Sequence, residues 1–184
     1  MDRATAWVEG VPGSGEGESY WLGLEHYPEA LGFINGYAKN RNLFEKNYRV
    51  KSLNVQVYAA VNLSGFATEW EAFYDAQAIT EKQVLELADS MEPQHVPLPF
   101  DRAGLISRMD KFQNSEAVRT LDIPQAKEMG LSGSENVPKE FRYIIRLEIR
   151  ATYPSTTWED TCIAELWPDY GQVTEVIVSG DSQR

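Results

Sequence analysis

The chain has one cysteine, Cys162, and two histidines, His26 and His95, among its 184 residues. A single cysteine excludes an internal disulfide, and its place in the apolar run Thr161-Cys-Ile163 is typical of a small core residue. No base stands near it in the sequence, so a nucleophilic role is disfavoured. Neither histidine has a second metal-type ligand at a useful spacing, so a histidine-based metal site is not indicated.

Positive charge and long apolar runs are also scarce. The chain has 17 Lys and Arg residues against 28 Asp and Glu residues, which gives a net charge of −11. This balance argues against nucleic acid or an anionic membrane as a partner. No stretch is long and apolar enough to span a bilayer, so membrane insertion is not expected. An acidic surface is compatible with bound cations or neutral ligands, and it also favours solubility.

What the sequence does contain is a set of strand patterns near its two ends. A hydrophobic content of 42% and this length predict one globular domain over residues 1–184. In the clearest strand, Phe141–Ala151, apolar and charged residues alternate strictly. In residues 49–61, the alternation places Lys51 on the same face as Leu53. The other predicted strands are residues 20–24, 31–35, 162–167 and 173–179.

The middle of the chain has a different pattern. Thr80-Glu-Lys-Gln83 fits a capping box, and apolar residues then follow at helical spacing, which predicts a helix over residues 81–91. A second, weaker helical pattern runs through residues 101–121. Strands at both ends with clean alternation predict a mainly all-β, antiparallel β-sandwich, with a partly helical insertion at about residues 66–140.

Two turn-rich loops concentrate aromatic, amide and acidic residues. They are Gly32–Lys39, which contains Asn35-Gly36, and Tyr153–Glu165. The segment Asn47–Lys51 stands between them in the sequence. A β-sandwich commonly presents binding residues on such loops while its strands supply rigidity.

These segments resemble the discoidin-like (F5/8 type C) β-sandwich, and within it the NADase-type glycan-binding domain of bacterial exported proteins. The matching pieces occur in the family's order: Asp2-Arg-Ala-Thr-Ala-Trp-Val-Glu-Gly10, Pro12-Gly-Ser-Gly15, Ile34-Asn-Gly-Tyr-Ala-Lys39, Asn47-Tyr-Arg-Val-Lys51 and Tyr153–Glu165. The resemblance implies a jelly-roll fold of the galactose-binding type. It also implies an extracellular, cell-surface or periplasmic location.

The resemblance further implies a structural Ca²⁺ site. Its ligands in this chain would be Asp2, Thr5 and Glu165, helped by backbone carbonyls. Ca²⁺ takes several hard oxygen ligands, including carboxylates, so these residue types are suitable. The alternative is that Glu165 faces solvent, because strand alternation places it on the same face as Ile163.

A glycan-binding groove is the second site that the loops indicate. Sugars are bound by aromatic rings against their C–H faces and by planar polar groups on their hydroxyls. In the alternative, structural interpretation, Asn35 shapes its turn, Arg49 pairs with Asp160, and Tyr153 packs against Pro154. The candidate ligand-binding residues are Asn35, Tyr37, Asn47, Arg49, Tyr153, Trp158 and Asp160.

A glycosidase is the enzyme alternative, since it needs two carboxylates across a cleft. Glu16, Glu18, Glu159 and Asp160 are available, but carboxylates are abundant in an acidic chain. The sequence therefore favours a protein that is not an enzyme.

A protein-binding or adhesion module is the remaining alternative. The insertion contains Trp70, Phe73 and Tyr74, and aromatic residues anchor many protein interfaces. We expect carbohydrate recognition as the main function, with the protein-interaction module as the alternative.

Overall fold

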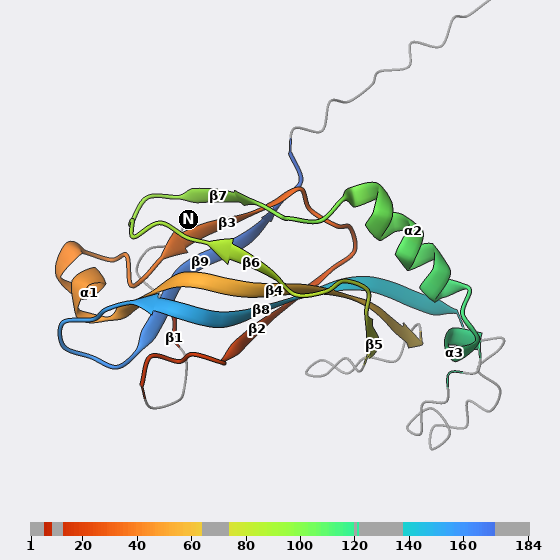
Figure 1. The fold of residues 1–184 in the computed structure, drawn as a ribbon, viewed down its shortest axis with the longest axis horizontal. Coiled ribbons are helices and arrows are strands. Elements are labelled where there is room, and N and C mark those ends of the chain that lie inside the picture. Colours follow the sequence, from red (N-terminus) through yellow and green to blue (C-terminus); the bar gives the residue numbers. More distant parts are fainter. Residues whose placement is uncertain (1–5, 9–12, 64–73, 120, 122–137, 172–184) are drawn as a thin grey trace, which may run out of the picture.

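The computed structural model describes residues 6–8, 13–63, 74–119, 121 and 138–171. Within these residues, strands form most of the regular structure, and they run in the order drawn in Figure 1. The strands are β1 (Trp7–Val8), β2 (Ser19–Leu24), β3 (Ala30–Asn35), β4 (Tyr48–Leu63), β5 (Asp75–Ala78), β6 (Gln83–Glu86), β7 (Gln94–Pro97), β8 (Lys139–Tyr153) and β9 (Thr161–Asp169). The helices are α1 (Arg41–Lys46), α2 (Arg102–Gln113) and α3 (Glu116–Arg119).

The strands form one hydrogen-bonded sheet that is folded into two layers. One layer has the order β2-β8-β4, with β5 and β6 on the other side of β4, and the second has β1 and β3 on either side of β9 and β7 beyond β3. The layers join where Tyr48 and Arg49 of β4 pair in parallel with Thr161 and Cys162 of β9. Cys162 is 1% exposed at this junction, so the prediction of a buried core thiol is confirmed.

The main core lies between the two layers. The antiparallel pair of β4 and β8 runs side by side across most of the molecule (Figure 1) and supplies alternating buried residues such as Val55, Val57, Ile145 and Leu147. Leu31 and Phe33 of β3 belong to the same cluster of buried side chains. The predicted mainly all-β sandwich is therefore confirmed.

A β-bulge in β4 alters the alternation predicted for residues 49–61. Val50 pairs with Thr152 and Ser52 with Ala151, so Lys51 is an extra residue in β4. The register shifts back at the next pair, Leu53 with Ile149, where Arg150 is the extra residue in β8. A bulge adds a residue to one strand and reverses which face the following side chains occupy. As a result Lys51 is exposed while Leu53 is buried, although simple alternation placed them on the same face.

A second bulge, in β9, has the same effect. Ile34 pairs with Glu165 and Asn35 with Ile163, so Ala164 is the extra residue. Ile163 belongs to the main core, whereas Ala164 packs with Ile34 on the outer face of this layer. The expectation that Ile163 and Glu165 share a face is wrong, because the bulge shifts the alternation between them.

The helix predicted over residues 81–91 is also wrong. Residues 83–86 form β6, and Leu85 pairs with Leu53 of β4. Leu85 and Leu87 are buried on alternate positions, which is the strand period. The Thr80 hydroxyl does not cap a helix, because it accepts a hydrogen bond of 2.9 Å from the backbone N–H of Val57.

The weaker helical pattern over residues 101–121 is confirmed by α2 and α3. Asp101 caps α2 by accepting a 2.7 Å hydrogen bond from Gly104 N, and Leu105, Met109 and Phe112 of α2 join the main core. These two helices lie at one end of the molecule, opposite α1 (Figure 1). None of the helices in the described residues is long and apolar enough to cross a membrane. The predicted strand at residues 173–179 lies outside the described residues.

The outer face of the second layer depends on a close contact between Trp167 and Gly32, which are paired across β9 and β3. A Cβ placed on Gly32 would lie 1.9 Å from Cε2 of Trp167, so the indole lies directly on the glycine backbone. The His95 ring meets the same indole edge-on, with 6.0 Å between ring centroids.

This contact predicts that Gly32→Ala lowers the free energy of unfolding by about 1–3 kcal/mol, because the added methyl displaces the indole. The same substitution in a Trp167→Ala background is expected to cost almost nothing. Urea denaturation of the two single variants and the double variant measures this coupling. An equal cost in both backgrounds would mean that Gly32 is required for another reason.

Candidate functional site

The loops that carry the predicted ligand-binding residues meet at one end of the sandwich, around α1 (Figure 1). Asn40 caps α1 by accepting a 2.9 Å hydrogen bond from Leu43 N, and the Asn47 side chain donates 2.7 Å to Leu43 O at the other end. Gly36 precedes this helix with a φ of +67°, and a Cβ there would lie 2.6 Å from Cγ of Arg49. A glycine is therefore needed for both conformation and space.

The β8–β9 loop is fixed onto the last turn of α1. The backbone N–H of Thr156 donates to Glu45 O at 3.0 Å, and that of Trp158 donates to Lys46 O at 2.8 Å. Tyr48 N donates in turn to Asp160 O at 2.9 Å. These hydrogen bonds hold the loop in a defined shape before any ligand arrives.

Arg49 is the centre of this end of the molecule and is only 6% exposed. Its Nε and Nη2 donate to the two carboxylate oxygens of Asp89 at 3.0 and 2.9 Å. Its Nη1 donates to the carbonyls of Asn47 and Pro154 at 3.0 and 2.6 Å. The guanidinium also lies 5.1 Å from the ring centroid of Phe44. Arg49 thus joins β4, α1, the segment after β6 and the β8–β9 loop.

Asn35 makes a similar set of contacts and is fully buried. Its Nδ2 donates to the carbonyls of Val50 and Ala88 at 2.7 and 3.1 Å. Its Oδ1 accepts from the backbone N–H groups of Val50 and Gly36, each at 3.0 Å. Both Asn35 and Arg49 therefore have their polar atoms committed to the fold, as does Asn47.

The remaining predicted ligand-binding residues are more accessible. Trp158 is 39% exposed, and the ammonium of Lys46 lies 5.2 Å from its ring centroid. Asp160 is exposed, and Tyr37 and Tyr153 are half-buried. The Tyr153 hydroxyl donates to Leu87 O at 2.9 Å, and the ammonium of Lys51 lies 5.9 Å from its ring centroid. The structure thus divides the predicted set into a buried scaffold and a surface group of Tyr37, Tyr153, Trp158 and Asp160.

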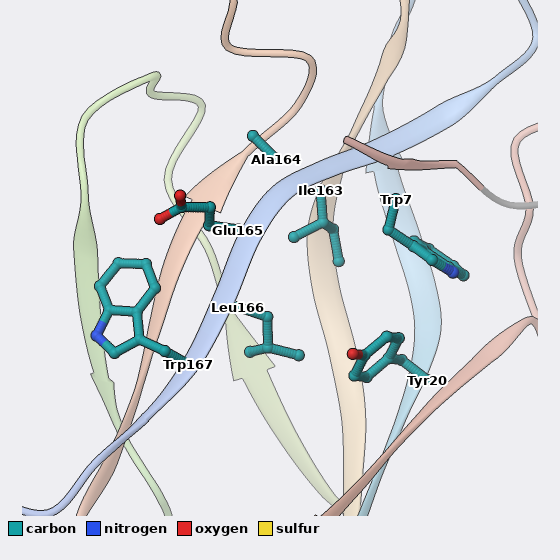
Figure 2. Close-up of a pocket in the computed structure, with 7 residues that line it drawn as sticks. All are labelled: Trp7, Tyr20, Ile163, Ala164, Glu165, Leu166 and Trp167. Carbon is teal, nitrogen blue, oxygen red and sulfur yellow. The ribbon is translucent and has the colours of Figure 1, made fainter. Parts of the chain in front are cut away.

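Of the predicted calcium ligands, the structure describes Glu165, whereas Asp2 and Thr5 lie outside the described residues. Figure 2 shows Glu165 and Trp167 projecting to one side of β9, while Ile163 and Leu166 project toward Trp7 and Tyr20. The recess that these residues line has a volume of about 550 Å³. Within the described part of the chain, no group of three or more His, Cys, Asp or Glu side chains is placed to hold a metal.

Sequence reasoning missed Asp89 as the partner of Arg49, because residues 81–91 were predicted as a helix. The alternative that Arg49 pairs with Asp160 is not what the structure shows. Of the aromatic residues proposed for protein binding, Trp70 and Phe73 lie outside the described residues. Tyr74 is half-buried, and its hydroxyl accepts a 3.0 Å hydrogen bond from Nε of Arg142.

A comparison with protein families assigns the domain as a whole. The family model described as the NAD glycohydrolase translocation F5/8 type C domain matches residues 1–168. The chain belongs to this family. The match includes the loop end and residues 66–140, and the family description names a translocation domain rather than a catalytic one. Neither the curated proteins nor the solved structures compared with this F5/8 type C domain include a match.

The Arg49 contacts predict a large effect of Arg49→Met on stability. Removing the guanidinium leaves the Pro154 and Asn47 carbonyls and the Asp89 carboxylate without their donor, and we expect a loss of about 2–3 kcal/mol in unfolding free energy. Urea denaturation measures it. Asp160→Asn is the matched control and is expected to change stability by less than about 0.5 kcal/mol. Equal effects of the two substitutions would contradict the pairing of Arg49 with Asp89.

Proposed function

We propose that this F5/8 type C domain is a non-catalytic carbohydrate-recognition module of an exported or surface-associated bacterial protein. The observation that carries the proposal is Trp158, a large aromatic side chain held exposed on a loop that is already fixed in shape. Preorganisation favours binding because little conformational entropy is lost when the ligand arrives. The family membership supports a binding or translocation role of the whole domain.

The chemistry of the surface group supports a sugar as the ligand. Trp158 and the half-buried rings of Tyr37 and Tyr153 offer apolar surfaces for the C–H face of a pyranose. The Asp160 carboxylate accepts hydrogen bonds from hydroxyls, and the nearby ammonium of Lys46 donates them. The fixed positions of these groups derive from Asn35, Asn47 and Arg49, which act from beneath as positioning residues.

Trp158→Ala is expected to weaken binding to the best glycan on an array by at least about tenfold, because an anchoring ring at a binding surface contributes about 1.4 kcal/mol or more. The melting temperature should change little, since the ring is partly solvated. The array signal of the purified domain and its variants is the measurement.

Tyr170→Ala provides the control for this experiment, because Tyr170 is an aromatic residue of similar exposure outside the α1 end. It is expected to bind glycans as the unmodified domain does. An array with no signal for the unmodified domain would refute carbohydrate recognition. Loss of a protein partner on Tyr74→Ala would then favour the protein-interaction alternative.

The calcium site remains part of the proposal. Glu165 would supply one hard oxygen ligand on β9, and Asp2 and Thr5 would complete the protein ligands that the family resemblance implies. The ion would tie the start of the chain to β9 and so stabilise the domain without taking part in any chemical step.

If this assignment is correct, millimolar CaCl₂ should raise the melting temperature of the unmodified domain by several degrees, because a ligand that binds only the folded state stabilises it. Glu165→Gln should abolish the rise while keeping the side-chain volume. MgCl₂ at the same concentration is the control, since Mg²⁺ requires a smaller octahedral site. An identical rise in Glu165→Gln would exclude Glu165 as a ligand.

A further inference from the structure

A second surface with unassigned polar and aromatic groups is the outer face of the layer formed by β2, β8 and β4. The strand register places Trp21 of β2 opposite Arg146 of β8, which is opposite Gln56 of β4. Two residues further along each strand, Gly23 is opposite Ile144, which is opposite Tyr58. Because the core residues of these strands occupy the alternate positions, these side chains all point away from the core.

The aromatic centre of this face is the pair Trp21 and Tyr58. Trp21 is 52% exposed, and its ring centroid lies 5.5 Å from that of Tyr58, with 53° between the ring planes. The guanidinium of Arg146 lies 5.3 Å from the Trp21 ring centroid. This arrangement holds a large indole at the surface without burying it.

Beside this pair lies an open space over Gly23. A Cβ added at Gly23 would meet no atom within 4 Å in the described part of the chain. Glycine inside a strand weakens the strand, and it often marks a place where a ligand approaches the backbone closely. The structure gives no packing reason for a glycine here, which contrasts with Gly32 under Trp167.

Polar groups around the aromatic pair are held in fixed positions. Glu148 accepts 2.9 Å from Asn54 Nδ2 and pairs with Lys82 Nζ at 3.1 Å and with Arg146 Nη2 at 2.7 Å. The Asn54 hydrogen bond, followed by that from Lys82, lowers the pKa of the Glu148 carboxyl below its ordinary value. The carboxylate is therefore ionised at neutral pH and is a stable acceptor.

The charges of this face are nearly balanced. Arg142, Arg146 and Lys82 carry positive charge, and Glu148 together with Glu25, which pairs with Arg142 at 3.2 Å, carries negative charge. A chain with a net charge of −11 thus has a locally neutral surface here. Such a surface suits a neutral ligand better than a polyanion or a basic peptide.

We propose that the face centred on Trp21, Tyr58 and Gly23 is a second binding site, which takes a linear neutral oligosaccharide lying along the sheet. A pyranose C–H face would rest on the rings of Trp21 and Tyr58, with the adjoining sugar over Gly23. The guanidinium of Arg146 would bind hydroxyl groups. The Gln56 amide, which donates to Thr80 O at 2.9 Å and accepts from the Tyr58 hydroxyl at 3.0 Å, would hold the Tyr58 ring in position. The open sheet face has room for the interior of a chain, whereas Trp158 lies on a loop at the end of the sandwich.

This inference concerns a different surface from the proposed loop site and is tested separately from it. Gly23→Val fills the open space and adds a residue of higher strand propensity, so the fold should be at least as stable while binding is blocked. Trp21→Ala removes the aromatic surface. Ala76→Val on β5 is the matched control, because it adds the same type of bulk to an exposed strand position on the far side of β4.

The experiment is an array of linear neutral oligosaccharides of increasing length, probed with the domain, these three variants and Trp158→Ala. We expect at least one linear glycan whose signal falls about tenfold or more in Gly23→Val and Trp21→Ala, as loss of an anchoring contact predicts. Its signal should be retained in Ala76→Val and Trp158→Ala, and it should increase with chain length.

Two results would overturn the sheet-face site. In the first, the array detects no linear glycan at all, or the glycans that it detects keep their signal in Gly23→Val and Trp21→Ala. In the second, every signal that these variants lose is lost equally in Trp158→Ala, so that a single loop site explains all binding. The proposed loop site fails independently, if Trp158→Ala has no effect on any glycan.

Discussion

The buried guanidinium of Arg49 is the interaction on which the α1 end of this domain depends. It joins the start of β4 to the Asp89 carboxylate and to the Pro154 carbonyl, at 2.9 and 2.6 Å. A buried charge is stable only when its hydrogen bonds are made, so each partner segment must occupy its place for the others to hold theirs. Three loops distant in sequence are thereby fixed as one unit, and Trp158 is presented on that unit.

The division between buried polar and exposed aromatic residues follows from this constraint. Amides and a guanidinium that resemble ligand-binding groups in the sequence serve here as internal connectors, with Asn35 making four hydrogen bonds. Among the described residues, the exposed tryptophans are Trp158 at the loops and Trp21 on the sheet. Both have a cationic side chain against the ring, from Lys46 and Arg146 respectively. The buried polar groups therefore hold the loops and strands together, while both indoles keep an exposed face.

The sequence predicted the long strands because alternation is a local property, as in β8, where every second residue enters the core. It did not predict the bulges at Lys51 and Ala164, since a bulge depends on the register of two paired strands. Residues 81–91 satisfied a capping box, yet the gain from pairing Leu85 with Leu53 of β4 outweighs that local preference. The loop cluster was predicted through the family resemblance, but which of its members are buried depends on tertiary contacts that no local pattern encodes.

Cys162 lies at the junction where β4 and β9 pair in parallel, opposite Arg49, and its side chain is buried. A thiol in that position reacts with a small reagent only when the two layers separate locally or the domain unfolds. The rate of thiol modification under native conditions therefore reports the opening of this junction directly. Cys162 is therefore a natural single-site probe for separation of the two layers. Such a probe can test whether the layers separate in a domain whose family is named for translocation.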